Sequence, residues 1–380
     1  MLLRVVVPLL CTSALTAAVL AAGTTGGQDC DSTMPLKVGI IGAGANTKSR
    51  HIPGLKAIDG VEIVSVANRS PESTAAVADE FDIPKRPGTW QELIDDPEVD
   101  AVVIGTWPYM HKTMVIAALD AGKHVMTEAR MAMDATEAKE MLAAAQRRPG
   151  QVTQIVPSPM TLQYDATIQR LVREGALGQL LRVDVRGCTG TALDESKPLH
   201  WRQMPEFSGL NIMTLGIFYE AVRRWVGDAT EVVAMGKTHV KSRVDPVTGA
   251  QHHLKIPDHI DVLGTLPSGA QLHMLVSDVL VGKGRPAAEF WIYGSEADLH
   301  YTLGPGGGLT ICKHGAEPEP VDPDGGVGGG WRVEEEFVSA IRGQEKISHT
   351  RFEDGVCYMQ FTEAVWKSMQ GAGAVRLPLV

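Results

Sequence analysis

The sequence predicts an α/β protein whose first half forms a doubly wound parallel sheet. Short apolar runs alternate with helical stretches along this half, which is the pattern of strand–helix–strand units. The first apolar run also ends in a glycine-rich turn that leads into a helix. In such a sheet, ligands bind in the crevice at the carboxyl ends of the strands. We therefore expect the functional site on that rim.

The individual elements follow from local patterns. Ser70 is suited to be the N-cap of a helix that has Pro71 at its first position. Gly122 ends the next helix, and Asp134, with a glutamate three residues later, starts another. Apolar runs between these helices predict strands at 36–41, 61–67, 100–105, 123–127 and 151–156.

Length and composition limit the possible functions. The 380 residues are enough for two large domains, and 44% hydrophobic with 21% charged residues excludes a disordered or fibrous chain. The net charge of −10 and the lack of a dense Lys/Arg run argue against nucleic acid as a partner. The five cysteines are widely spaced, so neither a disulfide framework nor a zinc finger is expected. His252, His253 and His259 lack partners at ligand spacing, so we expect no metal site.

Residues 1–33 read as a leader that differs from the rest of the chain. Arg4 is the only charge before Asp29, and residues 5–22 are almost all apolar, which is typical of a secretory signal peptide. The run is also long enough to be an uncleaved membrane anchor. Alternatively, translation starts at Met34, just before the first strand, and the protein is cytoplasmic instead of exported or periplasmic. The sequence leaves these alternatives open.

The glycine-rich turn predicts dinucleotide binding. It matches G-x-G-x-x-G except that Thr47 replaces the last glycine. Glycines there allow a tight turn and close approach of a pyrophosphate to the helix N-terminus. Pro53 is expected to kink or break the helix that follows. The cofactor-binding candidates in this turn are Gly42, Gly44, Ala45, Asn46 and Thr47.

The end of the second strand indicates which dinucleotide is bound. An NAD site usually has an acidic residue there for the ribose hydroxyls, but this chain has Asn68, Arg69 and Ser70. Arg69 can pair with a 2′-phosphate, and Ser70 at the helix start can add a donor. We therefore favour NADP. In the alternative, Arg69 is solvated and NAD binds through Asn68.

Several motifs together resemble the glucose–fructose oxidoreductase/inositol dehydrogenase/MocA (Gfo/Idh/MocA) family. The resemblance spans about residues 36–378. The matching positions are 38–44, His51, 61–71, Thr106, His111, 118–125, Glu128, 174–178, Trp201-Arg202 and 293–296.

The resemblance implies a two-domain enzyme. A Rossmann domain at 34–156 would be followed at 157–380 by an α+β domain with a large, mostly antiparallel sheet and a last helix at about 354–369. Family members oxidise or reduce sugars, inositols or related polyols with NAD(P), and often oligomerise through that sheet. The further cofactor-binding candidates on the rim are Thr106, Trp107, His111 and Glu128.

The chain departs from the family where the chemistry is usually done. The family's E-K-P lysine aligns with Ala129, and the aspartate and histidine of its later D-x-G-x-H motif align with Thr214 and Phe218. Hydride transfer from a carbinol needs a base for the hydroxyl proton, and the reverse reaction needs an acid or a cation. Neither alanine nor phenylalanine can serve, and threonine is a poor base near pH 7.

Other residues are candidates to replace the missing groups. Arg130, one residue beyond the missing lysine, could clamp an anionic substrate. Tyr219, Glu220 and His200 are the remaining catalytic candidates, although Glu220 also suits a surface carboxylate and His200 a loop histidine. Tyr164-Asp165 is a further candidate from the second domain.

Three functions remain in competition. The leading one is an NADP-preferring oxidoreductase that acts on a carbohydrate-like substrate with an unusual acid/base set. The second is a binding or regulatory protein that keeps the dinucleotide pocket without redox chemistry. The third is NAD-assisted cleavage of a glycosidic bond, for which no paired carboxylates are evident.

Overall fold

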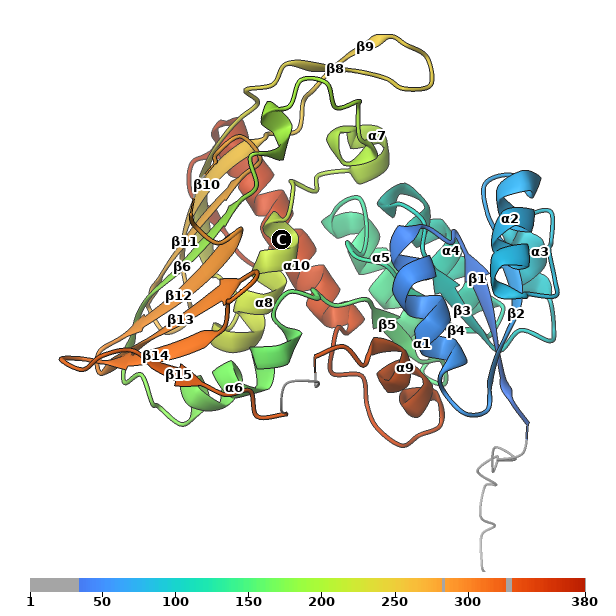
Figure 1. The fold of residues 1–380 in the computed structure, drawn as a ribbon, viewed down its shortest axis with the longest axis horizontal. Helices are drawn as coiled ribbons and strands as arrows, with labels where there is room; N and C mark the ends of the chain where they lie inside the picture. The colour runs from blue at the N-terminus through green and yellow to red at the C-terminus, as the bar shows by residue number, and fades with distance from the viewer. Residues whose placement is uncertain (1–33, 282–283, 326–329, 380) are drawn as a thin grey trace, which may run out of the picture. The chain divides into compact units, whose positions relative to one another are not determined.

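The computed structural model describes residues 34–281, 284–325 and 330–379 (Figure 1). The leader expected at 1–33 lies outside the described residues. No helix in the described ranges is both long and apolar enough to cross a membrane.

The first half is the predicted doubly wound sheet. Five parallel strands lie in the order β2-β1-β3-β4-β5, so that the first strand of the chain is near the middle. Their bounds are β1 Leu36–Ile41, β2 Val61–Ala67, β3 Ala101–Ile104, β4 His124–Thr127 and β5 Thr153–Ile155. The strands are apolar because both faces are covered by helices.

Helices cover this sheet, and their starts follow the capping signals. Ser70 caps α2 (Pro71–Phe81) and Asp134 caps α5 (Ala135–Gln146), each side chain accepting a hydrogen bond from the third helical N–H. The helix after the glycine turn is broken, as expected: a π-helical turn at Thr47–His51 precedes α1 (Ile52–Lys56). Pro53 lies in the first turn of α1, where a missing N–H costs little. The remaining two helices are α3 (Trp90–Asp95) and α4 (Pro108–Asp120).

The second half is built on a nine-stranded sheet, as the resemblance implied. The strand order is β15-β14-β13-β12-β6-β11-β10-β7-β16, and only β6 and β11 pair in parallel. The bounds are β6 Leu180–Cys188, β7 Glu231–Lys237, β10 His259–Thr265, β11 Gln271–Ser277, β12 Ala288–Gly294, β13 Ala297–Leu303, β14 Leu309–Lys313, β15 Glu319–Val321 and β16 Val375–Arg376. A small ribbon of β8 (Ser242–Val244) and β9 (Gln251–His253) stands apart from it.

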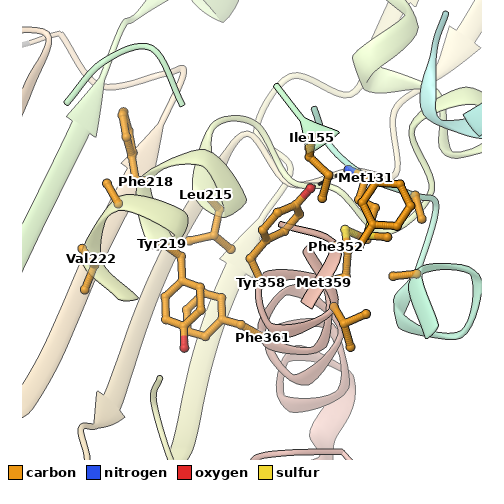
Figure 2. Packing of buried hydrophobic residues seen from close by; sticks show 14 of the residues in the cluster. Met131, Ile155, Leu215, Phe218, Tyr219, Val222, Phe352, Tyr358, Met359 and Phe361 are labelled. Atoms are coloured by element: carbon orange, nitrogen blue, oxygen red, sulfur yellow. Dashed lines mark hydrogen bonds between the residues drawn. The ribbon is translucent and has the colours of Figure 1, made fainter. Parts of the chain in front are cut away.

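A helical layer packs on the inner face of the nine-stranded sheet. It contains α6 (Leu162–Arg173), α8 (Leu215–Val226) and α10 (Phe352–Lys367) (Figure 1). The ring of Phe218 lies against Gly187 of β6, where an added Cβ would be 2.2 Å from it. Tyr219 of α8 stacks on Phe361 of α10 with a centroid separation of 3.5 Å (Figure 2). The buried side chains of this layer belong to one continuous apolar core that also includes residues of the parallel sheet, such as Ile104 and Val125.

A late segment of the chain, from α9 to Thr350, returns to the parallel sheet. Helix α9 (Val333–Ile341) packs on α1, and its Val333 and Phe337 join the core beside β1. Backbone hydrogen bonds of 2.9 and 3.1 Å join Ile155 at the end of β5 to Thr350. The first sheet is therefore completed by residues from early and late segments of the chain.

The sequence patterns missed several of these elements. In the second half, apolar runs predict strands at 180–186, 231–235, 259–266, 270–276 and 289–293, and these correspond to β6, β7, β10, β11 and β12. The residues Leu266-Pro-Ser-Gly-Ala270 also predict a hairpin turn, which joins β10 to β11. Strands β13, β14 and β15 are not predicted, because their short alternating runs are hard to tell from loops. Glycine-rich stretches at 304–308 and 325–330 predict flexible loops; the first is the short connection between β13 and β14, and the second lies largely outside the described residues.

The stacked pair of Tyr219 and Phe361 generates a stability prediction. Phe361→Ala should lower the free energy of unfolding by about 3–5 kcal/mol, because it leaves a cavity in the core where Phe361 is fully buried. Urea unfolding followed by circular dichroism measures this loss. As a control, Val247→Ala should cost little, because Val247 is 90% exposed. Equal losses in the two variants would contradict this view of the core.

Candidate functional site

A cavity of about 610 Å³ lies at the carboxyl ends of β1, β2 and β3, on the predicted rim. Its walls come from the glycine turn, the end of β2, the turn after β3 and the segment that starts α3. The lining residues are 41–44, 67–69, Ser73, 88–91, 105–107, Tyr109, Met110 and Met114. The cavity is large enough for a cofactor-sized ligand.

The glycine turn is shaped by close backbone contacts. Gly42 has a φ of +78°, a conformation that side chains disfavour. A Cβ on Gly105 would lie 2.3 Å from both the Gly42 carbonyl oxygen and Thr47 Oγ1. Thr47 is therefore packed into the turn, and it is only 1% exposed. A Cβ on Gly44 would meet just one atom, at 3.8 Å, so the space above Gly44 is open for a ligand.

The end of β2 carries a positive charge and no carboxylate. The side-chain oxygen of Asn68 accepts a hydrogen bond of 2.7 Å from the backbone N–H of Ala43, which holds the glycine turn against β2. Arg69 lines the cavity, is exposed, and makes no ion pair within the described residues. Ser70 is engaged as the cap of α2. The open space over Gly44 and the free guanidinium fit a dinucleotide phosphate.

A buried network joins the glycine turn to the turn after β4. Glu128 accepts hydrogen bonds from Asn46 Nδ2 at 2.5 Å and from His51 Nε2 at 3.0 Å. The other ring nitrogen of His51 lies 2.5 Å from Glu334 of α9, which also accepts from the indole of Trp331. Asn46 and Glu128 therefore shape the turn rather than line the cavity.

The two carboxylates keep His51 charged. Burial alone would lower the pKa of His51, but the hydrogen bonds and charges of Glu128 and Glu334 outweigh it and raise the pKa to about 9. Burial would likewise raise the pKa of Glu128, but the histidine lowers it. At pH 7 the site thus contains an ionised carboxylate–imidazolium–carboxylate chain.

Of the other predicted rim residues, His111 connects two turns by hydrogen bonds, and Trp107 belongs to a group of packed aromatic rings. The buried ring of His111 lies 3.0 Å from the Thr106 carbonyl oxygen and 3.1 Å from that of Arg130, so it joins the turns after β3 and β4. Burial lowers the pKa of His111, which is neutral at pH 7. Trp107 stacks on Trp201 at 5.3 Å and meets the edge of Phe207. The wall therefore joins α4 to the loop after β6.

Arg130 lies after β4 and packs against the start of α8, outside the lining of the first cavity. Its side chain is 3% exposed, and its stem passes the first turn of α8, where a Cβ on Gly216 would be 3.2 Å from Arg130 Cδ. Nε has no hydrogen-bond partner, and no ion pair of Arg130 occurs within the described residues. Burial and then the charge of Arg202 lower its pKa to about 10, so the group remains a cation at pH 7.

His200 lies near a second cavity, of about 370 Å³, together with Arg202. The exposed ring of His200 accepts a hydrogen bond of 3.2 Å at Nδ1 from the backbone N–H of Arg202. Partial shielding of the ring from water and then the charge of Arg202 lower the pKa of His200, so it is neutral at pH 7. With Nδ1 accepting, the proton is on Nε2, which is a donor.

Tyr219 and Glu220 are held inside the helical layer, away from both cavities. The hydroxyl of Tyr219 accepts from the Ala229 N–H at 2.8 Å, and burial raises its pKa well above the usual range. Glu220 accepts from the Ser158 N–H at 2.8 Å and pairs with Arg224. The structure does not bring either residue to the rim.

The same Arg224 also pairs with Asp165, at 2.6 Å. Asp165 is buried and lies at the start of α6, so this ion pair ties α6 to α8. The candidate pair Tyr164-Asp165 is accordingly part of the helical layer at this position.

Sequence reasoning missed one wall of the first cavity. Residues 88–91 line it, and the Thr89 side chain caps α3 by accepting from the Glu92 N–H. This capping signal could have been read from the sequence, but nothing in it placed α3 beside the glycine turn. His252 and His253 lie on β9, and no group of three metal-binding side chains occurs within the described residues.

The charged state of His51 predicts a pH-dependent stability. A histidine pKa raised to about 9 in the folded state adds stability that is complete below pH 6.5 and is lost as the pH rises to about 9. The difference in unfolding free energy between the wild type and His51→Gln should therefore shrink by about 2–3 kcal/mol over that range. Urea titrations at a series of pH values measure it.

The control for this measurement is His314→Gln, because the side chain of His314 is 55% exposed. Its stability difference from the wild type should stay nearly constant with pH. A difference for His51→Gln that is equally flat would show that His51 is neutral in the folded protein.

Comparison with known proteins places this geometry in a family. A family model described as an oxidoreductase family with an NAD-binding Rossmann fold matches residues 36–155, and one for the GFO/IDH/MocA C-terminal domain matches residues 166–300. A levoglucosan dehydrogenase structure in complex with NADH and L-sorbose superimposes with a TM-score of 0.81 at 22% identity, covering 90% of this chain and 99% of the other. A structure of an NAD-binding oxidoreductase from Klebsiella pneumoniae gives 0.78 at 22% identity, with coverage of 91% and 100%. These likenesses support the fold.

Similarity in sequence extends over most of the chain. The 1,5-anhydro-D-fructose reductase of Ensifer adhaerens is 32% identical over 341 residues, which are 87% of this chain and 95% of the relative. Levoglucosan dehydrogenase of Pseudarthrobacter phenanthrenivorans is 27% identical over 247 residues, 62% of this chain and 60% of the relative. The chain belongs to the Gfo/Idh/MocA family of oxidoreductases.

Proposed function

We propose that this protein is an NADP-preferring oxidoreductase that moves a hydride to or from a carbon of a sugar or related polyol. The observation that carries the proposal is the cavity over Gly42 and Gly44, at the carboxyl ends of the parallel strands. Family membership supports the reaction class. Relatives named as an anhydrofructose reductase and a levoglucosan dehydrogenase support a carbohydrate substrate.

The reaction needs three things from the chain. In the oxidising direction, a carbinol carbon loses a hydride with its two electrons, its hydroxyl loses a proton, and a carbonyl results. The nicotinamide dinucleotide supplies the acceptor or donor of that hydride when bound. The protein binds both partners, steadies the oxygen that carries developing negative charge, and moves its proton.

Arg69 supports NADP as the preferred cofactor. Asn68 already accepts the Ala43 N–H, so only part of its side chain remains for a ribose. The exposed guanidinium of Arg69 has no carboxylate partner in the described chain and borders the same cavity. A 2′-phosphate would supply the missing anion, whereas the NAD ribose would not.

Arg130 and His200 are our proposed groups for the oxygen and its proton. Arg130 offers a fixed positive charge in the turn after β4. The family's lysine would lie one residue earlier in the same turn, at the position of Ala129. The Nε2–H of His200 can donate a hydrogen bond to that oxygen in the reducing direction, while water at this exposed residue supplies the proton. Tyr219 and Glu220, which are engaged in the helical layer, act in our proposal by holding α8 in place.

The cofactor proposal predicts a selective loss in Arg69→Ala. Calorimetric titration should show tighter binding of NADPH than of NADH to the wild type. The substitution should weaken NADPH binding about tenfold or more, the value of one charge-assisted contact, and leave NADH binding nearly unchanged. Arg148→Ala, an exposed arginine at the far end of α5, serves as the control.

Three outcomes of this titration decide between the functions. Equal weakening of both nucleotides would contradict a role for Arg69 at the 2′-phosphate. Binding of neither nucleotide to the wild type would overturn the proposed function. NADPH binding without turnover across a broad carbohydrate panel would favour the binding or regulatory protein.

We also propose that the outer face of the nine-stranded sheet joins two copies of the chain. Three apolar side chains are exposed on this face: Val233 (42%) and Met235 (79%) of β7, and Leu263 of β10 (55%). Val233 and Leu263 are direct cross-strand neighbours, so part of this surface is contiguous. Contiguous exposed apolar area is typical of a protein interface.

Charge placed on this face should separate the copies. Met235→Asp together with Leu263→Asp should reduce the mass measured by light scattering from that of an oligomer to that of one chain, because the buried carboxylates would lack partners. Val247→Asp, in the loop between β8 and β9, should leave the mass unchanged. A wild-type protein that is monomeric at micromolar concentration would refute this part of the proposal.

A further inference from the structure

We infer that the substrate carries a carboxylate and that Arg130 and Arg202 form its binding subsite. The substrate class is thus a sugar acid or a related polyhydroxy acid, rather than a neutral sugar. The inference rests on the proposed function, since it adds the substrate class to the same site.

The first step is the unpaired buried charge of Arg130. Arg130 is 97% buried, yet its Nε has no acceptor and its guanidinium has no carboxylate partner within the described residues. An uncompensated buried cation costs several kcal/mol, so such a group normally has a counterion. Arg224 pairs with Asp165 and Glu220, and the equally buried Arg243 donates to the backbone carbonyl oxygens of Asp194 and Ala192, whereas no acceptor is present for Arg130 Nε in the described chain.

The second step is the arrangement around Arg130. Its carbonyl oxygen is bound by His111, and the N–H of Met131 donates to Tyr358 at 2.6 Å, so the backbone is fixed on both sides. The stem passes the start of α8, where Gly216 leaves room for it. The cation is therefore held rigidly at the junction of the parallel sheet and the helical layer.

The third step is a second free arginine nearby. Arg202 lies over the ring of Trp201 at 4.3 Å and lines the cavity that also contains His200. It is exposed and makes no ion pair in the described parts of the chain. The Trp201 ring stacks on Trp107, which lines the cofactor cavity. The stacked rings of Trp201 and Trp107 thus connect Arg202 to the wall of the cofactor cavity.

The fourth step is the charge balance of the site. Glu128 is the carboxylate nearest in sequence to Arg130, but it is engaged by His51 and Asn46. The cation of His51 is in turn matched by Glu334 as well as Glu128. With Glu128 and Glu334 as anions and His51, Arg130 and Arg202 as cations, one positive charge remains in excess, and a ligand carboxylate would offset it.

A substrate with a carboxylate also matches the donors of this site better than a neutral polyol does. Two guanidinium groups present planar donors that match the two oxygens of a carboxylate. A neutral sugar would leave one positive charge without an anion in a partly dehydrated site. The binding of a hydroxy acid would place its hydroxyl-bearing carbons beside the same residues, where the proposed hydride transfer takes place.

Matched ligand pairs test this inference. Calorimetry with the full chain saturated with NADPH would compare D-gluconate with D-glucitol and D-glucuronate with D-glucose, together with aldonates of shorter chain. At least one acid should bind about tenfold or more tightly than its neutral partner. Arg130→Met and Arg202→Gln should each weaken binding of that acid roughly 10- to 100-fold and leave NADPH affinity unchanged.

Three further variants make the result specific. Arg130→Lys should retain part of the preference for the acid, because it keeps the charge but not the planar fork. Arg173→Gln, an exposed arginine on α6, should bind both members of a pair as the wild type does. The exposed position of Arg202 makes Arg202→Gln informative even where Arg130→Met fails to fold.

The outcomes separate this inference from the proposed function. Normal NADPH binding with equal affinity for acids and neutral partners, or with no acid bound, would overturn the inference and leave the cofactor proposal standing. A loss of NADPH affinity in Arg130→Met and Arg202→Gln would assign the arginines to the cofactor and also overturn it. Absence of NADPH binding in the wild type would instead overturn the proposed function.

Discussion

The buried imidazolium of His51 is the interaction on which the arrangement of the site depends. It joins Glu128, at the end of β4, to Glu334 of α9, which is 283 residues away from His51 in the chain. Either carboxylate alone would be costly to bury beside the apolar core, and the histidine alone would lose its proton. Together they hold the glycine turn through Asn46 and bring α9 against the first sheet. The glycine turn, the end of β4 and helix α9 are therefore held together by one set of charges.

Contacts between residues far apart in the chain, such as that of His51 with Glu334, limit how much of the fold the sequence predicts. The five parallel strands and the capped helices depend on local signals, such as Ser70 before α2 and Asp134 before α5, and these were predicted correctly. The return of α9 to the parallel sheet depends on contacts between distant residues. Helical periodicity indicates that Val333 and Phe337 face a core, but it does not indicate which core. The domain boundary near residue 156 stays a prediction, because early and late segments of the chain build the first sheet.

The site was predictable to the extent that it depends on backbone geometry. Gly42, Gly44 and Thr106 line the cavity because a strand end followed by a tight turn places them there. Sequence spacing did not predict the site where the direction of a side chain decides its role. Tyr219 and Phe218, which aligns with the family's histidine, are neighbours on α8, yet both rings pack against other buried rings. Thr47 is a similar case, since its hydroxyl packs against Gly105 and not toward the cavity.

Arg130 places a buried cation directly after Ala129, the position that the family resemblance aligns with a lysine. Its pKa of about 10 keeps the guanidinium charged at neutral pH, so it is not a ready base. A permanent cation stabilises an alkoxide as it forms, which helps the addition of a hydride to a carbonyl. The proton must then come from another source. His200 donates a hydrogen bond through Nε2 in the tautomer that its own hydrogen bond selects, and water at this exposed residue supplies the proton. In the proposed reaction these two residues stabilise the alkoxide, and this lowers the barrier in both directions.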